Sequence, residues 1–128
     1  MGSRFVHIVD DDQPVRDSLR WLLSSADIDS QAYDTPEAFL EATRAQPDGC
    51  VLLDICMPGI DGVTVLKRLA SGGMTAPVII MTGHGNQSDA DEVLRLGAAD
   101  FIEKPFAADR LLAVIERVMV PPAQADAR

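Results

Sequence analysis

Charged and hydroxyl side chains stand near the ends of four apolar, strand-length runs of this sequence. Asp10 and Asp11 follow the first run, Asp54 the second and Thr82 the third, and Lys104 comes two residues after the fourth. Two carboxylates 4 Å apart repel each other by about 4 kcal/mol at an effective dielectric of 20, so acids gathered in one small cleft need a compensating cation. The ammonium of Lys104 and a bound divalent ion are the two candidates.

The oxygen-rich donor set favours Mg²⁺, or Mn²⁺ in its place, because these hard ions need only a few carboxylates. Zinc is disfavoured, since His7 lies in the middle of an apolar run and the two cysteines, Cys50 and Cys56, have no clustered partner. A carboxylate beside a divalent ion and a lysine is a good nucleophile toward a phosphoryl group. The set therefore predicts a site that makes and holds an acyl phosphate. The plainer alternative is that these acids only cap helices and solvate loops.

Apolar runs of strand length alternate along the chain with amphipathic runs of helix length. The expected strands are residues 5–9, 50–53, 77–81 and 99–102, with 30–33 a weaker candidate. The expected helices open at Pro14, at Thr35 and at Asp61, with a fourth over 86–96 that stops at Gly97 and a fifth that begins at Asp109. Because the strands are almost uniformly apolar, we expect them to be buried on both faces, as in a parallel sheet.

This alternation predicts an α/β fold, with a single open, doubly wound, five-stranded parallel sheet that has helices on both faces. In such sheets, ligands bind beyond the carboxyl ends of the strands. The acids, the threonine and the lysine named above are therefore expected to converge on one edge of the sheet.

Length and composition limit the classes of function. A chain of 128 residues suffices for one core and not for two, and its net charge of −9 argues against this domain itself binding nucleic acid or an anionic membrane. No apolar run reaches about 18 residues, and two cysteines are too few for a disulfide framework, so we expect a cytoplasmic, reducing setting. The domain is expected over residues 5–119, after an extension over 1–4 and before a linker-like tail over 120–128.

Four motifs in order make this sequence similar to a known family. Asp10-Asp11, Asp54-Ile55-Cys56-Met57-Pro58, Thr82-Gly83 and Lys104-Pro105-Phe106 together resemble the response-regulator receiver domain of two-component signalling, most closely its FixJ-like branch. The resemblance implies the flavodoxin-like strand order 2-1-3-4-5. It also implies a phosphoacceptor that takes its phosphoryl group from a histidine kinase and switches an output, rather than an enzyme with an external substrate. Its only reactions would be self-phosphorylation from a phosphodonor and autodephosphorylation.

The resemblance further assigns roles to the metal ligands and to the phosphoacceptor. Asp54 would be the phosphoacceptor. Asp11 and Asp54 would ligate Mg²⁺ directly, Asp10 through water and Cys56 through its backbone carbonyl. Cys56, together with His84, would also border the path of the hydrolytic water and modulate dephosphorylation.

A second group of residues would contact the phosphoryl group and respond to its presence. Lys104 would pair with it, and the bond from Lys104 to Pro105 is expected to be cis. Thr82 and Phe101 match the family's switch pair, in which the hydroxyl moves to a phosphoryl oxygen and the ring follows inward. An ordinary role for Phe101 as a core aromatic is compatible with this assignment.

The resemblance also indicates two surfaces and a longer protein. The kinase would dock on Val15, Ser18, Leu22, Pro105 and Phe106. A weak, phosphorylation-dependent dimer would use Asp91, Arg95 and Asp100. A DNA-binding domain usually follows the receiver in the FixJ-like branch, which favours transcriptional regulation; the alternative is a single-domain regulator that acts through protein contacts. Trp21 lies in an apolar helix, and we expect it to pack in or beside the core rather than to serve as a surface recognition residue.

Three other functions remain as alternatives. A phosphatase of the haloacid-dehalogenase type also forms an aspartyl phosphate, but it needs a second Asp at position 56, where this chain has Cys56. An FMN carrier needs a phosphate-binding loop after the first strand, where Asp10 and its acidic neighbours would repel the phosphate. A receiver that does not depend on phosphorylation would not require Asp11, Asp54, Thr82 and Lys104 together.

Overall fold

The computed structural model of the chain describes residues 5–42, 49–55, 62–71, 76–83 and 87–119. Strands and helices alternate along them, as the sequence predicts. They are β1 (Phe5–Val9), α1 (Gln13–Ser25), β2 (Asp29–Tyr33), α2 (Pro36–Ala42), β3 (Cys50–Asp54), α3 (Gly62–Ser71), β4 (Val78–Thr82), α4 (Gln87–Arg95), β5 (Asp100–Glu103) and α5 (Ala108–Met119). None of the helices within these ranges is long and apolar enough to cross a membrane.

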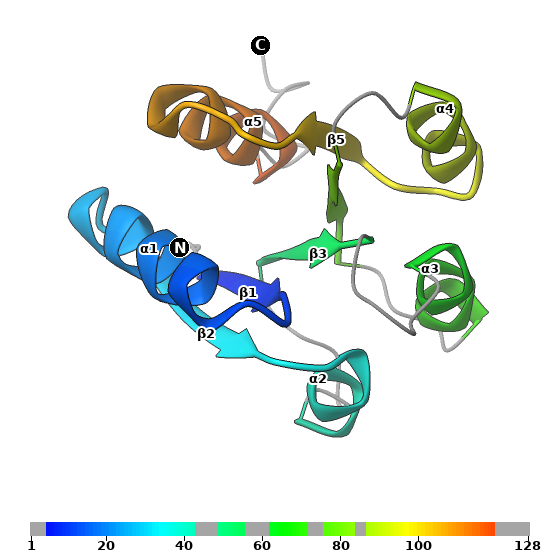
Figure 1. Cartoon of the computed structure of the whole chain (residues 1–128), viewed down its shortest axis with the longest axis horizontal. Coiled ribbons are helices and arrows are strands. Elements are labelled where there is room, and N and C mark those ends of the chain that lie inside the picture. Colours follow the sequence, from blue (N-terminus) through cyan, green and yellow to red (C-terminus); the bar gives the residue numbers. More distant parts are fainter. Residues whose placement is uncertain (1–4, 43–48, 56–61, 72–75, 84–86, 120–128) are drawn as a thin grey trace, which may run out of the picture.

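The strands of the described residues form one sheet in the order β2-β1-β3-β4-β5. Every neighbouring pair is parallel, so all strands end at the same edge of the sheet. Helices α1 and α5 cover one face, and α2, α3 and α4 cover the other (Figure 1). The open, doubly wound sheet and its order are therefore confirmed.

Each face of the sheet carries its own core, because successive strand residues point to opposite sides. Toward α1 and α5 lie Ile8, Leu52 and Ile79, which pack against Leu19, Leu23 and Ile115 among others. Toward α2, α3 and α4 lie Val9, Val51, Leu53 and Ile80, which pack against Phe39, Val65 and Val93. The two layers of helices thus hold the sheet from both sides.

Burial on both faces holds for the inner strands and not for the two at the edges. All residues of β3 and β4 are buried, whereas β2 is exposed or half-buried along its length and β5 buries only Ile102. An edge strand has a neighbour on one side only, so part of its surface stays in contact with water. The polar composition of 29–33 reflects this position, which explains why it gave a weak strand pattern.

Local signals set several of the helix boundaries. The Thr35 Oγ1 accepts a hydrogen bond of 3.1 Å from the backbone N–H of Ala38, which confirms the predicted cap of α2. Gly97 has a φ of +109° just after α4, which confirms it as the residue that ends this helix. Helix α5 begins at Ala108, one residue before the predicted start at Asp109, which lies in the first turn of the helix. Asp61 lies outside the described residues.

Strands β3 and β4 each extend one residue further than their apolar runs. Asp54 pairs with Met81, and Thr82 pairs with Glu103, within the parallel ladders. The two polar residues are therefore the last residues of their strands rather than the first residues of the following loops. Backbone pairing continues where the hydrophobic pattern stops, because the ladder needs only peptide groups.

An aromatic cluster that the sequence analysis did not foresee fills the α2 side of β1 and β2. The His7 ring lies 4.8 Å from Phe5, 5.9 Å from Tyr33 and 5.7 Å from Phe39, measured between ring centroids. Its Nδ1 is 3.1 Å from the Tyr33 hydroxyl oxygen. His7 is thus buried in the middle of β1, as its place within an apolar run predicts.

Candidate functional site

The carboxyl ends of β1 and β3 bring three carboxylates together. Asp10 and Asp11 follow β1, Asp54 ends β3, and one oxygen from each lies within 4.8 Å of the other two. Asp10 and Asp54 are buried at 0% and 3% exposure, whereas Asp11 is exposed. The cluster arises because β1 and β3 are adjacent, parallel strands of the sheet, so their ends meet at one edge.

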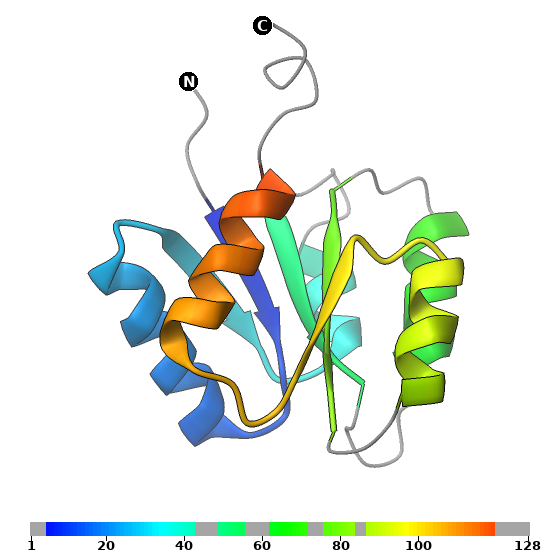
Figure 2. The ribbon, with the colours of Figure 1, turned by 90° about the horizontal axis from the view of Figure 1, so that it is seen from above.

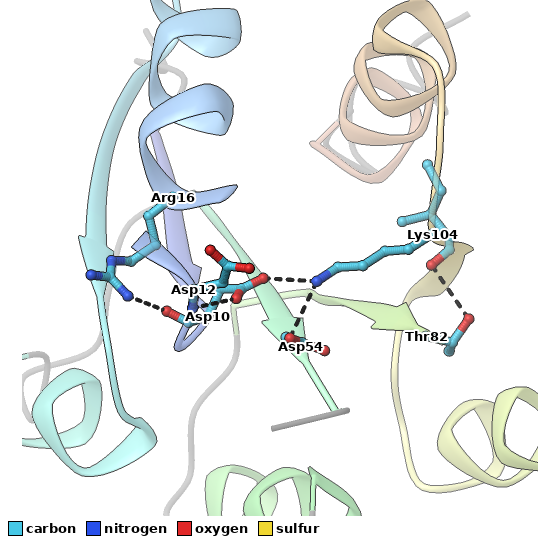
Figure 3. A network of polar contacts seen from close by, with 7 residues as sticks. Asp10, Asp12, Arg16, Asp54, Thr82 and Lys104 are labelled. Carbon is cyan, nitrogen blue, oxygen red and sulfur yellow. Dashed lines mark hydrogen bonds and ion pairs between the residues drawn. The ribbon is translucent and has the colours of Figure 1, made fainter. Parts of the chain in front are cut away.

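Lys104 supplies the positive charge that this cluster requires. Its Nζ donates to the Asp10 Oδ2 at 2.9 Å and to the Asp54 Oδ2 at 3.2 Å, reaching across from the end of β5 (Figure 3). Burial by itself lowers the pKa of Lys104, but the hydrogen bond to Asp10 and the charges of both aspartates outweigh it, and the pKa is raised. The lysine is therefore a cation that bridges the two buried carboxylates. Its bond to Pro105 is cis, as expected.

Asp10 is held through every polar group that it has. Its Oδ1 accepts a hydrogen bond of 2.9 Å from the backbone N–H of Asp12, while its Oδ2 accepts from Lys104. Its backbone N–H donates to the Tyr33 carbonyl oxygen at 3.1 Å, and its own carbonyl oxygen accepts from the Arg16 Nη1 at 2.7 Å. Asp12 is exposed and occupies the N-cap position of α1, where its side chain makes no capping hydrogen bond, and it is not one of the three clustered carboxylates.

Thr82 lies on the β5 side of this cluster (Figure 3). Its buried hydroxyl donates to the Ile102 carbonyl oxygen at 3.5 Å, and its carbonyl oxygen accepts from the backbone N–H of Lys104 at 2.9 Å. Phe101, the other member of the expected switch pair, is half-buried and packs against the core on the α2, α3 and α4 side. In this structure, the Thr82 hydroxyl therefore forms its hydrogen bond to the backbone of the neighbouring strand β5.

The donor set fits a magnesium ion. Its three members offer only carboxylate oxygens, which hard divalent cations prefer, and they lie within reach of one another. The exposed position of Asp11 leaves the cluster open to water, which Mg²⁺ retains in its coordination shell. Cys56, which the family resemblance adds through its carbonyl, and His84 lie outside the described residues.

The residues expected at the kinase-docking surface and at the dimer surface differ in their exposure to solvent. Ser18 and Pro105 are exposed, whereas Val15, Leu22 and Phe106 are half-buried and pack against the core between the sheet and the helices α1 and α5. On the other expected surface, Asp91 and Arg95 are exposed, and the carboxylate of Asp100 forms an ion pair with Arg117 of α5.

The expectation for Trp21 is wrong. Its side chain is 74% exposed, and with Phe5 and Ile28 it borders a shallow depression beside the amino-terminal ends of β1 and β2. The apolar stripe of α1 is carried by Leu19 and Leu23, and Trp21 lies outside it. An apolar residue type therefore did not establish the direction of its side chain.

Sequence reasoning did not predict the two contacts to the Asp10 backbone, one from the Arg16 guanidinium and one to the Tyr33 carbonyl oxygen. Arg16 lies four residues after Asp12, in the first turn of a helix whose start is marked by Pro14. A basic residue so soon after an acidic loop was the signal available in the sequence. Tyr33 gave no comparable signal, because its contribution is a main-chain carbonyl.

Comparisons with known proteins agree with this geometry. Residues 6–116 match the family of response regulator receiver domains. The chain is 47% identical over 111 residues to the transcriptional regulatory protein FixJ of Bradyrhizobium diazoefficiens, which covers 87% of this chain and 54% of that protein. The crystal structure of full-length FixJ from B. japonicum superposes with a TM-score of 0.86 at 42% identity, covering 99% of this chain and 61% of that one.

A second solved structure, described as FixJ-N, also superposes with a TM-score of 0.86, at 38% identity, and covers 93% of this chain and 95% of that one. The chain spans about half the length of the FixJ proteins that it matches.

Proposed function

Because this chain belongs to the response regulator receiver family, in its FixJ-like group, we propose that Asp54 accepts a phosphoryl group from a histidine kinase or from a small acyl phosphate. The observation that carries this proposal is the position of the Asp54 carboxylate. It is buried at the end of β3, 3.2 Å from a lysine ammonium and next to two further acids. Such a group is a nucleophile surrounded by the charges that phosphoryl transfer needs.

In the proposed transfer, a carboxylate oxygen of Asp54 forms a bond to phosphorus as the bond from phosphorus to the donor breaks. The donor's imidazole nitrogen or acyl oxygen leaves with the bonding electrons. Asp10, Asp11 and Asp54 would hold Mg²⁺ or Mn²⁺, with the carbonyl of Cys56 added by family resemblance. The bound ion would supply positive charge to neutralise the phosphoryl oxygens. Lys104 already contacts Asp54 and would pair with the new dianion.

The switch would then act through Thr82. Its hydrogen bond to the Ile102 carbonyl oxygen is long, at 3.5 Å, so releasing it costs little. A phosphoryl oxygen on Asp54 is a charged and stronger acceptor, which exists only in the phosphorylated state. This difference in contacts can shift the equilibrium between two conformations, and Phe101 would follow the hydroxyl inward.

For the whole protein, we propose transcriptional regulation through a DNA-binding domain, because the matched region spans only about half the length of relatives that are transcriptional regulatory proteins. The kinase would dock on the surface around Ser18 and Pro105 in the cytoplasm, with Val15, Leu22 and Phe106 beneath it. A phosphorylation-dependent dimer would use Asp91, Arg95 and Asp100. Cys56 and His84 would modulate the lifetime of the phosphoryl group.

The direct test is phosphorylation by acetyl phosphate, followed by intact-mass measurement. Wild type should gain one phosphoryl group in the presence of Mg²⁺ and none in the presence of a chelator. Asp54→Asn should gain none, while Asp17→Asn, an exposed acid on α1, should label like wild type. Labelling that persists in Asp54→Asn would place the nucleophile elsewhere.

The docking surface needs a test that separates the kinase from the chemistry. Ser18→Glu should slow transfer from the cognate kinase several-fold while leaving phosphorylation by acetyl phosphate unchanged, because Ser18 is exposed and belongs neither to the carboxylate cluster nor to the ion pairs of Lys104. Equal losses with both donors would show that the substitution had damaged the domain rather than the contact.

A further inference from the structure

Arg16 ties the start of α1 to the end of β1. Its Nη1 donates a hydrogen bond of 2.7 Å to the backbone carbonyl oxygen of Asp10, and its side chain is half-buried (Figure 3). Its own backbone N–H donates to the Asp12 carbonyl oxygen at 3.0 Å, within the first turn of the helix. The backbone and the guanidinium of Arg16 are therefore both hydrogen-bonded to the segment 10–12, which carries the acids.

The Asp10 carbonyl oxygen needs a donor of this kind. Val9, opposite Tyr33, is the last residue of β1 in the ladder with β2, and the last hydrogen bond from β2 on that side goes to the Asp10 N–H rather than to its carbonyl. Asp10 is fully buried, and a buried carbonyl left without a donor is strongly unfavourable. The guanidinium of Arg16 replaces the next hydrogen bond of the ladder.

The same carbonyl belongs to the planar peptide unit that joins Asp10 to Asp11. Fixing its oxygen therefore fixes the direction in which Asp11 leaves the strand. Asp11 is exposed, yet its carboxylate lies within 4.8 Å of those of Asp10 and Asp54. Ligands bind a metal best when their supporting contacts hold them in place beforehand.

We propose that Arg16 is a positioning residue for the divalent cation: by holding the Asp10–Asp11 peptide, it keeps Asp11 within ligating range of the other two carboxylates. The inference rests on the proposed function, in which these acids hold Mg²⁺. The positive charge of Arg16 has the opposite tendency, because a cation near the site repels Mg²⁺. Removing the side chain therefore weakens Mg²⁺ binding if positioning dominates and tightens it if charge dominates, so the sign of the change decides.

The experiment measures the Kd of Mg²⁺ alone by calorimetry or amide NMR shifts, and the initial rate of phosphorylation by acetyl phosphate over a range of Mg²⁺ concentrations. Arg16→Ala should raise the Kd about tenfold while the rate at saturating Mg²⁺ stays within twofold of wild type. Arg16→Lys, which keeps the charge and one donor group, should recover part of the affinity. Arg20→Ala, on the next turn of α1 and exposed, is the matched control and should bind Mg²⁺ like wild type or slightly more tightly.

A Kd for Arg16→Ala equal to or below that of Arg20→Ala would overturn the proposal. If circular dichroism shows that Arg16→Ala does not fold, Arg16→Met decides by the same comparison, since it keeps the aliphatic length of the side chain and removes the donor to the Asp10 carbonyl. If wild type binds Mg²⁺ but takes no phosphate on Asp54, the proposed function fails, while the Mg²⁺ titration still decides the role of Arg16.

Discussion

Along β3, four buried apolar residues are followed directly by Asp54, and along β1, Val9 is followed by Asp10. Within one residue, each of these strands changes from close-packed apolar side chains to a buried carboxylate. The strands end together at one edge of the sheet, as Figure 2 shows. The interior stabilises the fold by removing apolar surface from water. The strand ends hold carboxylates that repel one another and depend on Lys104. Stability and chemistry are thus supplied by adjacent stretches of the same strands, and substitutions should separate them.

The largest expected effect lies in the strand interior. Leu52→Ala should lower the free energy of unfolding by about 2–5 kcal/mol, because Leu52 is fully buried in the core against α1 and α5 and leaves a cavity. Urea denaturation measures it, and the loss should be the same with and without Mg²⁺. Leu94→Ala, at a residue 41% exposed, is the matched control and should cost less than about 1 kcal/mol. Equal costs would contradict the assignment of the core.

The next effect is at the strand ends and should respond to Mg²⁺. Lys104→Met should lower the free energy of unfolding at pH 7 by about 2 kcal/mol, between the values for exposed and fully buried ion pairs, because it leaves Asp10 and Asp54 without their cation. Saturating Mg²⁺ should restore most of this loss, unlike that of Leu52→Ala. Lys67→Met, at an exposed lysine of α3, should change little.

The pH dependence of the same ion pairs has a defined sign. The pKa of Lys104 is raised in the folded state, so its contribution to stability is complete below the ordinary lysine value of 10.5 and disappears as the pH rises through the raised pKa. The difference between wild type and Lys104→Met should therefore be present at pH 7 and shrink above pH 10.5. A difference that grows in that range would contradict the ion-pair assignment.

A smaller effect is expected from Mg²⁺ on the wild type. At ten times its Kd, the ion should raise the free energy of unfolding by about 1.4 kcal/mol, because it binds the folded state and not the unfolded chain. The increase should vanish in Asp11→Ala, remain in Asp17→Ala, and weaken as the pH falls and the carboxylates take up protons. Thermal or urea unfolding gives the values. Equal stabilisation of Asp11→Ala and wild type would remove Asp11 from the ligand set.

The smallest expected effect concerns Cys50, which begins β3 at the end opposite to Asp54. Burial raises the pKa of the Cys50 thiol from 9.0 to about 12, so this group stays neutral where Asp54 is charged and paired. A pKa raised in the folded state gives stability that is present below pH 9 and is lost between pH 9 and 12. The stability difference between wild type and Cys50→Ala should therefore shrink by about 1 kcal/mol from pH 8 to pH 10. A constant difference would mean that Cys50 is accessible to water.

The elements of the fold could be predicted because their signals are local. The alternation of apolar runs with helix caps such as Thr35 and Gly97 depends on residues close in sequence, and these elements appear where expected. The boundaries that differ do so for tertiary reasons. Asp54 and Thr82 belong to strands because neighbouring strands pair with their backbones, which no pattern of side chains announces.

The candidate site divides in the same way. Asp10, Asp11, Asp54 and Lys104 could be named from the sequence, since parallel strands must bring the residues at their carboxyl ends to one edge. The hydrogen bond of Arg16 to the Asp10 carbonyl could not, because it depends on where the first turn of α1 lies against β1. The exposure of Trp21 could not either, since an apolar residue type indicates a preference and packing decides the direction.

The sequence by itself determined the types of side chain at the strand ends, and with them the acidic, oxygen-only chemistry and the need for a cation. Only the tertiary structure decided how that need is met, with the Lys104 Nζ between Asp10 and Asp54, the Thr82 hydroxyl directed to β5 and Arg16 holding a main-chain oxygen. The physical reason is the distance along the chain over which each influence acts. Residue type and periodicity act over a few positions, whereas these contacts join residues up to 94 positions apart and exist only once the sheet has assembled.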